Sequence, residues 1–182
     1  QLCAFYELPP EQIRVITPDV GGGFGAKAFF YPEDLLLPWL ATRVNRPVRY
    51  TESRTESMNG LGHGRGQIQD VRIGGNRDGK ITAYEMKVIQ ESGAYPRFGA
   101  FLPFMTGRML TGTYHIPNAS MKSQSVVTNT VPTLAYRGAG RPEAAAAIER
   151  AVDMFAAEIG MDPAEVRRRN LVAQDQFPYT NG

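Results

Sequence analysis

Extended segments, several with alternating apolar and polar residues, are spread through the first two thirds of the chain. Strands are predicted over residues 12–17, 48–51, 66–74, 80–92 and 121–128. The pair 66–74 and 80–92 flanks Gly75-Asn76-Arg77-Asp78-Gly79, a sequence that favours a hairpin turn. The middle of the chain is therefore expected to be rich in β-structure.

Helical patterns occur on both sides of this region. Helices are predicted over residues 32–45, over 142–159, and from 163 onward. The longest has apolar residues at helical spacing, namely Ile148, Val152, Phe155 and Ile159. Pro38 disfavours the middle of the first helix, whereas Val166 and Leu171 are expected to face inward from the last. Residues 93–113 are expected to be partly helical and partly irregular. Together these patterns predict an α+β fold with a mixed β-sheet and packed helices.

The composition narrows the class of protein. Of 182 residues, 42% are hydrophobic and 21% charged, close to the average for a soluble globular domain. Lys+Arg (20) nearly balance Asp+Glu (18), which excludes a typical basic nucleic-acid-binding protein. Apolar runs are too short for a membrane span, and Cys3 alone cannot form a disulfide within the chain. Because the first residue is not methionine and the last residues are loop-like, we expect a piece of a longer protein.

The first chemical candidate is the cluster Val20-Gly21-Gly22-Gly23-Phe24-Gly25-Ala26-Lys27. A Walker phosphate loop is excluded because alanine, rather than Ser or Thr, follows the lysine. A dinucleotide fingerprint is nominally matched by Gly21, Gly23 and Ala26, but that fold opens a helix at its glycines. The predicted helix here begins only at Pro32. Two further interpretations remain: a structural glycine turn, or a cradle of backbone amides around residues 22–25 that binds an anion.

The second candidate is Ala135-Tyr136-Arg137-Gly138-Ala139-Gly140-Arg141-Pro142-Glu143. Its two arginines and two glycines come just before the longest predicted helix. That combination offers cationic donors and uncapped helix amides to one anionic ligand. An ordinary helix entry with solvated arginines is the alternative interpretation.

Taken together, the two motifs resemble the molybdenum hydroxylase family. Further segments continue the resemblance in the expected order: Ile13-Arg14-Val15-Ile16, Thr51-Glu52-Ser53-Arg54, Tyr114-His115-Ile116-Pro117-Asn118 and Arg167-Arg168-Arg169-Asn170-Leu171. More narrowly, the chain is similar to the molybdopterin-binding large subunit of aerobic carbon monoxide dehydrogenases. The resemblance implies that residues 1–182 are a partial molybdopterin-binding domain of a longer large subunit.

The resemblance also implies the cofactors and partners. The expected cofactor is a molybdenum–pyranopterin in its cytosine dinucleotide form, which oxidises a small substrate with oxygen from water. Electrons would leave through [2Fe–2S] clusters on a small subunit to FAD on a medium subunit, in the cytoplasm. Two alternatives stay open: a scaffold or assembly domain without cofactor, and a nicotinamide-dinucleotide-binding domain.

Site residues follow from the family only where the motifs match. The cofactor-binding residues implied are Gly22, Gly23, Phe24, Gly25, Arg137, Gly138 and Ala139. Phe24 and Arg137 are expected beside the molybdenum, with no side chain bound to it directly. The family's general base is a glutamate in a Gly-x-Gly-Glu setting, which this sequence lacks. No catalytic residue is therefore assigned, and the chain alone is expected to be inactive.

Three positions distinguish the chain from purine-oxidising relatives. Ala28 stands where they have a glutamate, Met105 near their substrate-holding arginine, and Ala139 where they have an aromatic residue. These residues are predicted to line the substrate pocket, which then lacks the anchors that a purine needs. An aldehyde or N-heterocycle is left as the substrate class. Neighbouring apolar residues could form a funnel, although core packing is favoured for them: Phe98, Phe101, Phe104, Met105 and Met109.

Gly138 bears on the metal itself. Copper-using members of the family carry a cysteine directly after the arginine of the second motif, whereas this chain has Gly138 after Arg137. Copper(I) selects thiolate ligands. The resemblance therefore predicts a centre without copper.

Overall fold

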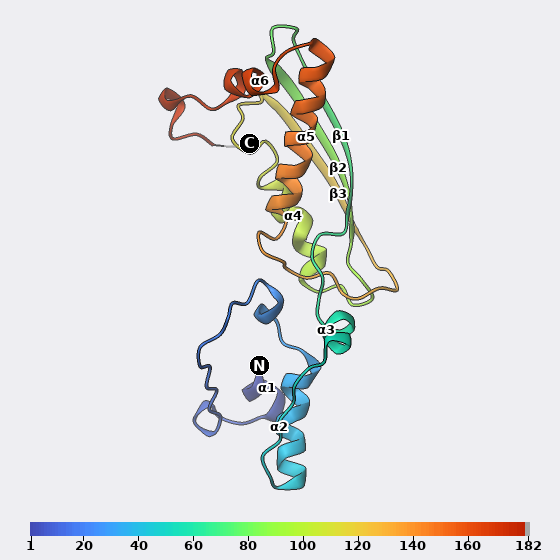
Figure 1. Ribbon diagram of the computed structural model, residues 1–182. Coiled ribbons are helices and arrows are strands. Elements are labelled where there is room, and N and C mark those ends of the chain that lie inside the picture. Colours follow the sequence, from blue (N-terminus) through green and yellow to red (C-terminus); the bar gives the residue numbers. More distant parts are fainter. Residues whose placement is uncertain (181–182) are drawn as a thin grey trace. The chain divides into compact units, whose positions relative to one another are not determined.

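The computed structural model describes residues 1–180. The chain divides into two compact units, Gln1–Leu61 and Gly62–Gly182, and each is described by itself (Figure 1). Within residues 1–180, no helix is long and apolar enough to cross a membrane.

The first unit consists of helices and irregular chain. Its helices are α1 (Leu2–Tyr6), α2 (Pro32–Val44) and α3 (Arg54–Gly60), with single 3₁₀ turns at Pro10–Gln12 and Ala26–Ala28. The prediction for α2 is confirmed, because Pro32 occupies its first turn and Tyr31 donates its backbone N–H to Asp34 Oδ2 at 2.9 Å. Pro38 is accommodated inside that helix.

Helix α3 was not predicted, although its signature is present in the sequence. Ser53 and Glu56 form a capping box, in which the Glu56 N–H donates to Ser53 Oγ at 3.2 Å and the Ser53 N–H to Glu56 Oε2 at 2.7 Å. The hydrogen bond from the Ser53 backbone lowers the pKa of the Glu56 carboxyl. A capping box without an apolar run behind it was the signal that could have revealed this helix.

The strands predicted at 12–17 and 48–51 are wrong. Residues 13–20 and 47–53 are irregular, and neither stretch pairs with another strand. A strand needs a partner for its backbone groups and a surface for its apolar face. Val15 and Ile16 instead remain 72% and 68% exposed, and no residue of the whole unit Gln1–Leu61 is buried. Alternation alone did not produce a strand here.

The second unit is built on a three-stranded mixed sheet. Its strands, β1 (Gln67–Gly75), β2 (Ile81–Glu91) and β3 (Asn118–Val126), lie in the order β1-β2-β3. The first two are antiparallel and joined by the predicted hairpin, whereas β3 runs parallel to β2. All three predicted strands of this region are confirmed, although β3 begins three residues earlier than expected.

Helix α5 (Arg141–Ile159) runs along one face of this sheet, as Figure 1 shows. Alternate residues of the central strand β2 face it, and the buried residues of both elements form one core: Ile81, Tyr84, Met86, Val88, Ile148, Val152 and Phe155. A short 3₁₀ helix (Phe98–Phe101) leads into α4 (Leu102–Gly107), which also contacts α5. The α+β fold with a mixed sheet and packed helices is thus confirmed.

Helix α6 (Pro163–Asn170) is hydrogen-bonded to the start of β2 and to the turn before it. The Asn170 side chain accepts the backbone N–H of Ile81 at 2.9 Å and donates to Gly79 O at 2.7 Å. Val166 is buried as predicted. The inward orientation predicted for Leu171 is wrong, because the helix ends at Asn170, the backbone becomes extended, and the Leu171 side chain is 48% exposed.

Candidate functional site

The glycine cluster forms an exposed loop with an unusual backbone. Gly22, Phe24 and Gly25 have φ angles of +107°, +50° and +101°. The Phe24 ring lies over Gly22, so that a Cβ added at Gly22 would come within 2.7 Å of the ring atom Cε2. Gly22 is therefore required by both its backbone angle and its close approach to the ring.

Short hydrogen-bonded turns follow this loop and lead to α2. The Ala28 N–H donates to Gly25 O at 3.1 Å, and the Tyr31 hydroxyl donates to Ala26 O at 2.7 Å. Helix α2 begins only at Pro32. The loop thus lacks the helix N-terminus that a dinucleotide pyrophosphate would use, which argues against the nicotinamide interpretation.

The second motif forms a tight loop directly before α5. The Ala139 N–H donates to Tyr136 O at 2.7 Å, and Arg141 donates to Gly138 O from both its backbone N–H and its Nη1, at 3.3 and 3.0 Å. Three successive residues, Gly138, Ala139 and Gly140, have positive φ angles of +97°, +43° and +89°. Gly140 is the N-cap of α5 and has no side chain to cap it. The positive end of a 19-residue helix therefore lies beside two arginines.

Backbone strain gathers at these loops. Within residues 1–180, five non-glycine residues have positive φ: Glu7, Phe24, Asn45, Arg65 and Ala139. Glu7 and Asn45 are the left-handed C-caps of α1 and α2, where such angles are ordinary. The other three lie in the two candidate loops or contact one of them. Strained residues of this kind cluster at ligand-binding sites.

Gly140 also packs the second loop onto α4. A Cβ added there would lie 2.8 Å from Leu102 O, from Met105 Cβ and from Thr106 N. Two of the predicted pocket residues, Met105 and Ala139, are therefore brought to the same junction. The third, Ala28, belongs to the first unit, and its place in the pocket stays a prediction.

Replacing Gly140 by alanine should destabilise this junction. The added methyl group meets the backbone of α4, and alanine at φ +89° is strained, so we expect a loss of roughly 1–3 kcal/mol in unfolding free energy. Urea unfolding of the chain followed by circular dichroism would measure it. The matched control is Ala139→Gly, which relieves a left-handed alanine in the same loop and should not lower stability. Equal stability of Gly140→Ala and wild type would contradict the packing.

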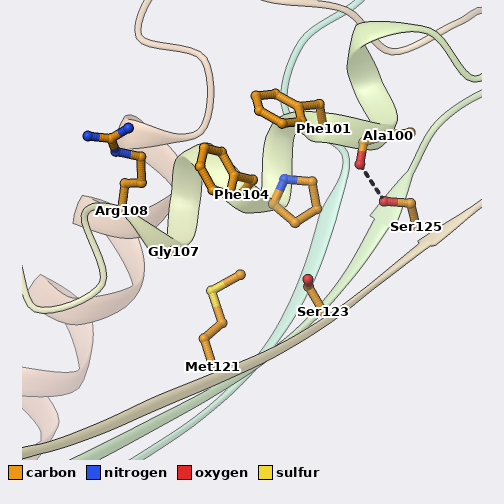
Figure 2. A pocket seen from close by; sticks show the side chains of 9 residues that line it. Ala100, Phe101, Phe104, Gly107, Arg108, Met121, Ser123 and Ser125 are labelled. Atoms are coloured by element: carbon orange, nitrogen blue, oxygen red, sulfur yellow. Dashed lines mark hydrogen bonds between the residues drawn. The ribbon is translucent and has the colours of Figure 1, made fainter. Parts of the chain in front are cut away.

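The aromatic residues around α4 are divided between two environments. Phe101 and Phe104 line a pocket of about 690 Å³ against β3, together with Met121 and Ser123 (Figure 2). Their side chains are 48% and 54% exposed, so the core packing favoured for them is wrong. Met105 instead lies at the Gly140 junction. The rings of Phe98, Phe101 and Phe104 contact one another in sequence order, with centroids 5.9 and 4.8 Å apart, and a substrate funnel along them stays a prediction.

Sequence reasoning missed Arg65, which binds the second loop directly. Residues 62–66 run parallel to residues 132–136, where His63 and Thr133 form an isolated bridge. From this segment Arg65 Nη2 donates to Arg137 O at 2.9 Å, and its guanidinium lies 4.9 Å from the centre of the Tyr136 ring. The only sequence signal was an arginine between two glycines, which is not specific.

The second loop and the N-terminus of α5 together form a site suited to an anionic group, and the α+β fold holds both in place. Residues 1–171 match the family described as the molybdopterin cofactor-binding domain. The chain belongs to this family, and the resemblance to molybdenum hydroxylases is confirmed.

Individual relatives agree with this assignment. The chain is 32% identical to the 6-hydroxypseudooxynicotine dehydrogenase complex subunit gamma of Paenarthrobacter nicotinovorans, over 100% of the chain and 23% of that protein. It is 34% identical to the carbon monoxide dehydrogenase large chain of Hydrogenophaga pseudoflava, over 95% and 22% respectively. Quinoline 2-oxidoreductase from Pseudomonas putida 86 superposes with a TM-score of 0.93 at 37% identity, over 99% of the chain and 23% of that structure. The chain thus spans less than a quarter of the length of these relatives.

The donors present fit a molybdopterin cofactor. Its oxygens and phosphates are anionic, and the second loop offers two guanidinium groups and the start of a long helix. Gly138 and Gly140 have positive φ angles, and a Cβ at either would collide with Pro142 or with α4, so the loop keeps its backbone shape only with glycine there. The solvated-arginine interpretation does not account for three successive left-handed residues.

Proposed function

We propose that residues 1–182 are a partial cofactor-binding domain in the large subunit of a molybdenum-dependent hydroxylase, similar to carbon monoxide dehydrogenase. The observation that carries this proposal is the loop of three left-handed residues that presents Arg137 and Arg141 at the N-terminus of α5. The family match over residues 1–171 supports it.

In this proposal the protein supplies binding and electrostatics. Gly22, Gly23, Phe24 and Gly25 present backbone amides to the anionic oxygens, and Arg137, Gly138 and Ala139 bind from the second loop. Fixed N–H dipoles and guanidinium groups stabilise negative charge without having to reorganise. Phe24 and Arg137 would be placed beside the metal without ligating it. When bound, the cofactor supplies oxidation of a substrate with oxygen derived from water.

The proposal also covers the partner subunits of the enzyme and the dinucleotide form of the pterin. Relatives bear names such as "complex subunit gamma" and "large subunit", which supports a multisubunit enzyme. We assign an iron–sulfur small subunit with [2Fe–2S] clusters, an FAD medium subunit, the cytosine dinucleotide form of the pterin, and a cytoplasmic location.

The substrate is proposed to be a small N-heterocycle or aldehyde. Ala28, Met105 and Ala139 would line its pocket, and none of them offers the charge or the ring face that a purine requires. Relatives named quinoline 2-oxidoreductase and nicotine 6-hydroxylase large subunit support the heterocycle class.

Replacing Arg137 by alanine in the complete complex tests the cofactor site. A hydrogen bond from a charged group is worth about 1.5–3 kcal/mol, so we expect molybdenum content or turnover to fall about tenfold or more. Arg150→Ala removes the same charge from the exposed side of α5, 13 residues after Arg137 (150 − 137), and should leave both unchanged. Wild-type molybdenum content and turnover in Arg137→Ala would refute the site. A wild-type complex without molybdenum would instead favour the scaffold alternative.

A further inference from the structure

We propose that Arg65 is a positioning residue for the cofactor loop. It holds the Arg137 carbonyl in place and neutralises the buried carboxylate of Glu143, so that an anionic cofactor can approach the start of α5. This inference rests on the proposed function.

Three contacts place the Arg65 guanidinium at the centre of the second loop. Its Nη2 donates to Arg137 O at 2.9 Å, and its Nη1 lies 3.4 Å from both carboxylate oxygens of Glu143. Its Cζ also lies over the Tyr136 ring, 4.9 Å from the ring centre. One side chain thus contacts the residue before Arg137, Arg137 itself and the first turn of α5.

The segment that carries Arg65 is shaped to deliver it. A Cβ at Gly64 would collide with the Tyr136 side chain, and Gly66 has a φ of +64°. Arg65 itself has a φ of +74°, a strained angle for a residue with a long side chain. Such strain persists only where surrounding contacts determine it.

A buried glutamine fixes that strained backbone. Gln90 has no exposed surface, and its Nε2 donates to Arg65 O at 3.1 Å. Its Oε1 in turn accepts from Gln67 Nε2 at 2.9 Å, and the same Gln67 nitrogen donates to Thr106 Oγ1 in α4 at 3.1 Å. The network connects the sheet, the Arg65 segment and α4 into one support.

Glu143 explains why a cation is needed at this point. Its side chain is only 5% exposed and lies in the first turn of α5. A buried carboxylate without a partner is strongly unfavourable, and it would repel an anionic ligand bound at the same helix end. Arg65 cancels this charge, which leaves the field of Arg137, Arg141 and the helix to act on the cofactor.

Lysine could not replace this arginine fully. The planar guanidinium serves a carbonyl, a carboxylate and an aromatic ring simultaneously, whereas an ammonium group is a single point charge. Arg65→Lys is therefore expected to keep the charge compensation and lose the fixed geometry of the loop.

The experiment uses the complete enzyme complex with Arg65→Ala, Arg65→Lys and the double variant Arg65→Ala/Glu143→Gln. Molybdenum per large subunit is measured by mass spectrometry, and hydrogen exchange is followed at the amide of Ala139. We expect Arg65→Ala to lose at least tenfold in molybdenum, Arg65→Lys to lose less, and the double variant to recover to within about threefold of wild type. Exchange at Ala139 should accelerate in all three variants, because each loses the hydrogen bond from Arg65 Nη2 to Arg137 O.

Recovery of molybdenum content in the double variant distinguishes charge neutralisation from a purely structural role of Arg65. Removing the Glu143 charge as well cannot repair a purely structural defect. A double variant no better than Arg65→Ala overturns the neutralising role. Unchanged molybdenum in Arg65→Ala with loss in Arg137→Ala overturns the inference alone, whereas no loss in Arg137→Ala overturns the proposed function. If Arg65→Ala fails to assemble, Arg65→Lys and the double variant test the inference instead. The inference then requires that molybdenum in the double variant exceed a tenth of the wild-type value.

Discussion

In the isolated 182-residue chain, residues 1–61 are expected to exchange their amide hydrogens at nearly unfolded rates while the sheet of the second unit stays protected. No residue of the first unit is buried, and large apolar side chains such as Val15, Phe24 and Trp39 are 72%, 54% and 43% exposed. Its longest helix, α2, has 13 residues and an internal proline. Helices of that length are marginal in water without tertiary packing.

Hydrogen exchange followed by mass spectrometry would measure this contrast. Peptides from β2 should exchange about a thousandfold more slowly or better, which corresponds to an opening free energy of about 4 kcal/mol. Peptides from the first unit should show almost no protection. The same peptides in the complete large subunit are the control, and there we expect them to be protected. Strong protection of residues 1–61 in the isolated chain would contradict the argument.

Hydroxylase turnover by that chain would also be unexpected, since no catalytic residue is assigned within it.

Sequence patterns predicted correctly those elements whose pairing or packing partners lie close by in the sequence or are marked by their own apolar pattern. Strands β1 and β2 are joined by a five-residue turn and pair with each other, and α5 covers them with apolar residues at helical spacing. The strands expected at 12–17 and 48–51 had similar alternation and no partner. The periodicity of apolar residues shows which face of a segment is apolar. Whether that segment forms a strand depends on pairing with another strand, which the local pattern does not contain.

The candidate site divides in the same way. Glycines marked both loops, because glycine permits left-handed backbone, and arginines marked the second loop, because arginine binds anions. Arg65 was missed, since its role depends on Gln90, Glu143 and a loop that lies more than 70 residues away in sequence. Strain at Ala139 was equally invisible, because alanine gives no sign of an unusual φ angle.

Copper is expected to be absent from the purified complex, at less than about 0.1 copper per molybdenum. Copper(I) requires a soft ligand such as a thiolate, and the position after Arg137 is Gly138, which has no side chain. The sole thiol of the chain belongs to Cys3 in the first unit. Metal analysis by mass spectrometry decides the matter. Copper near one per molybdenum, with carbon monoxide oxidation lost when the copper is stripped, would contradict this prediction.

Restoring a cysteine should not create such a centre. Gly138 has a φ of +97°, and a Cβ there would lie 2.5 Å from Pro142 Cγ. Gly138→Cys must therefore shift the turn that leads into α5, which also orients Arg137. We expect this variant to lose molybdenum content rather than to gain copper. The control is Ala139→Cys, which introduces the same thiol one residue later, at a position that already carries a Cβ. A Gly138→Cys complex with full molybdenum and stoichiometric copper would show that the loop adapts, and that a single residue separates the two kinds of centre.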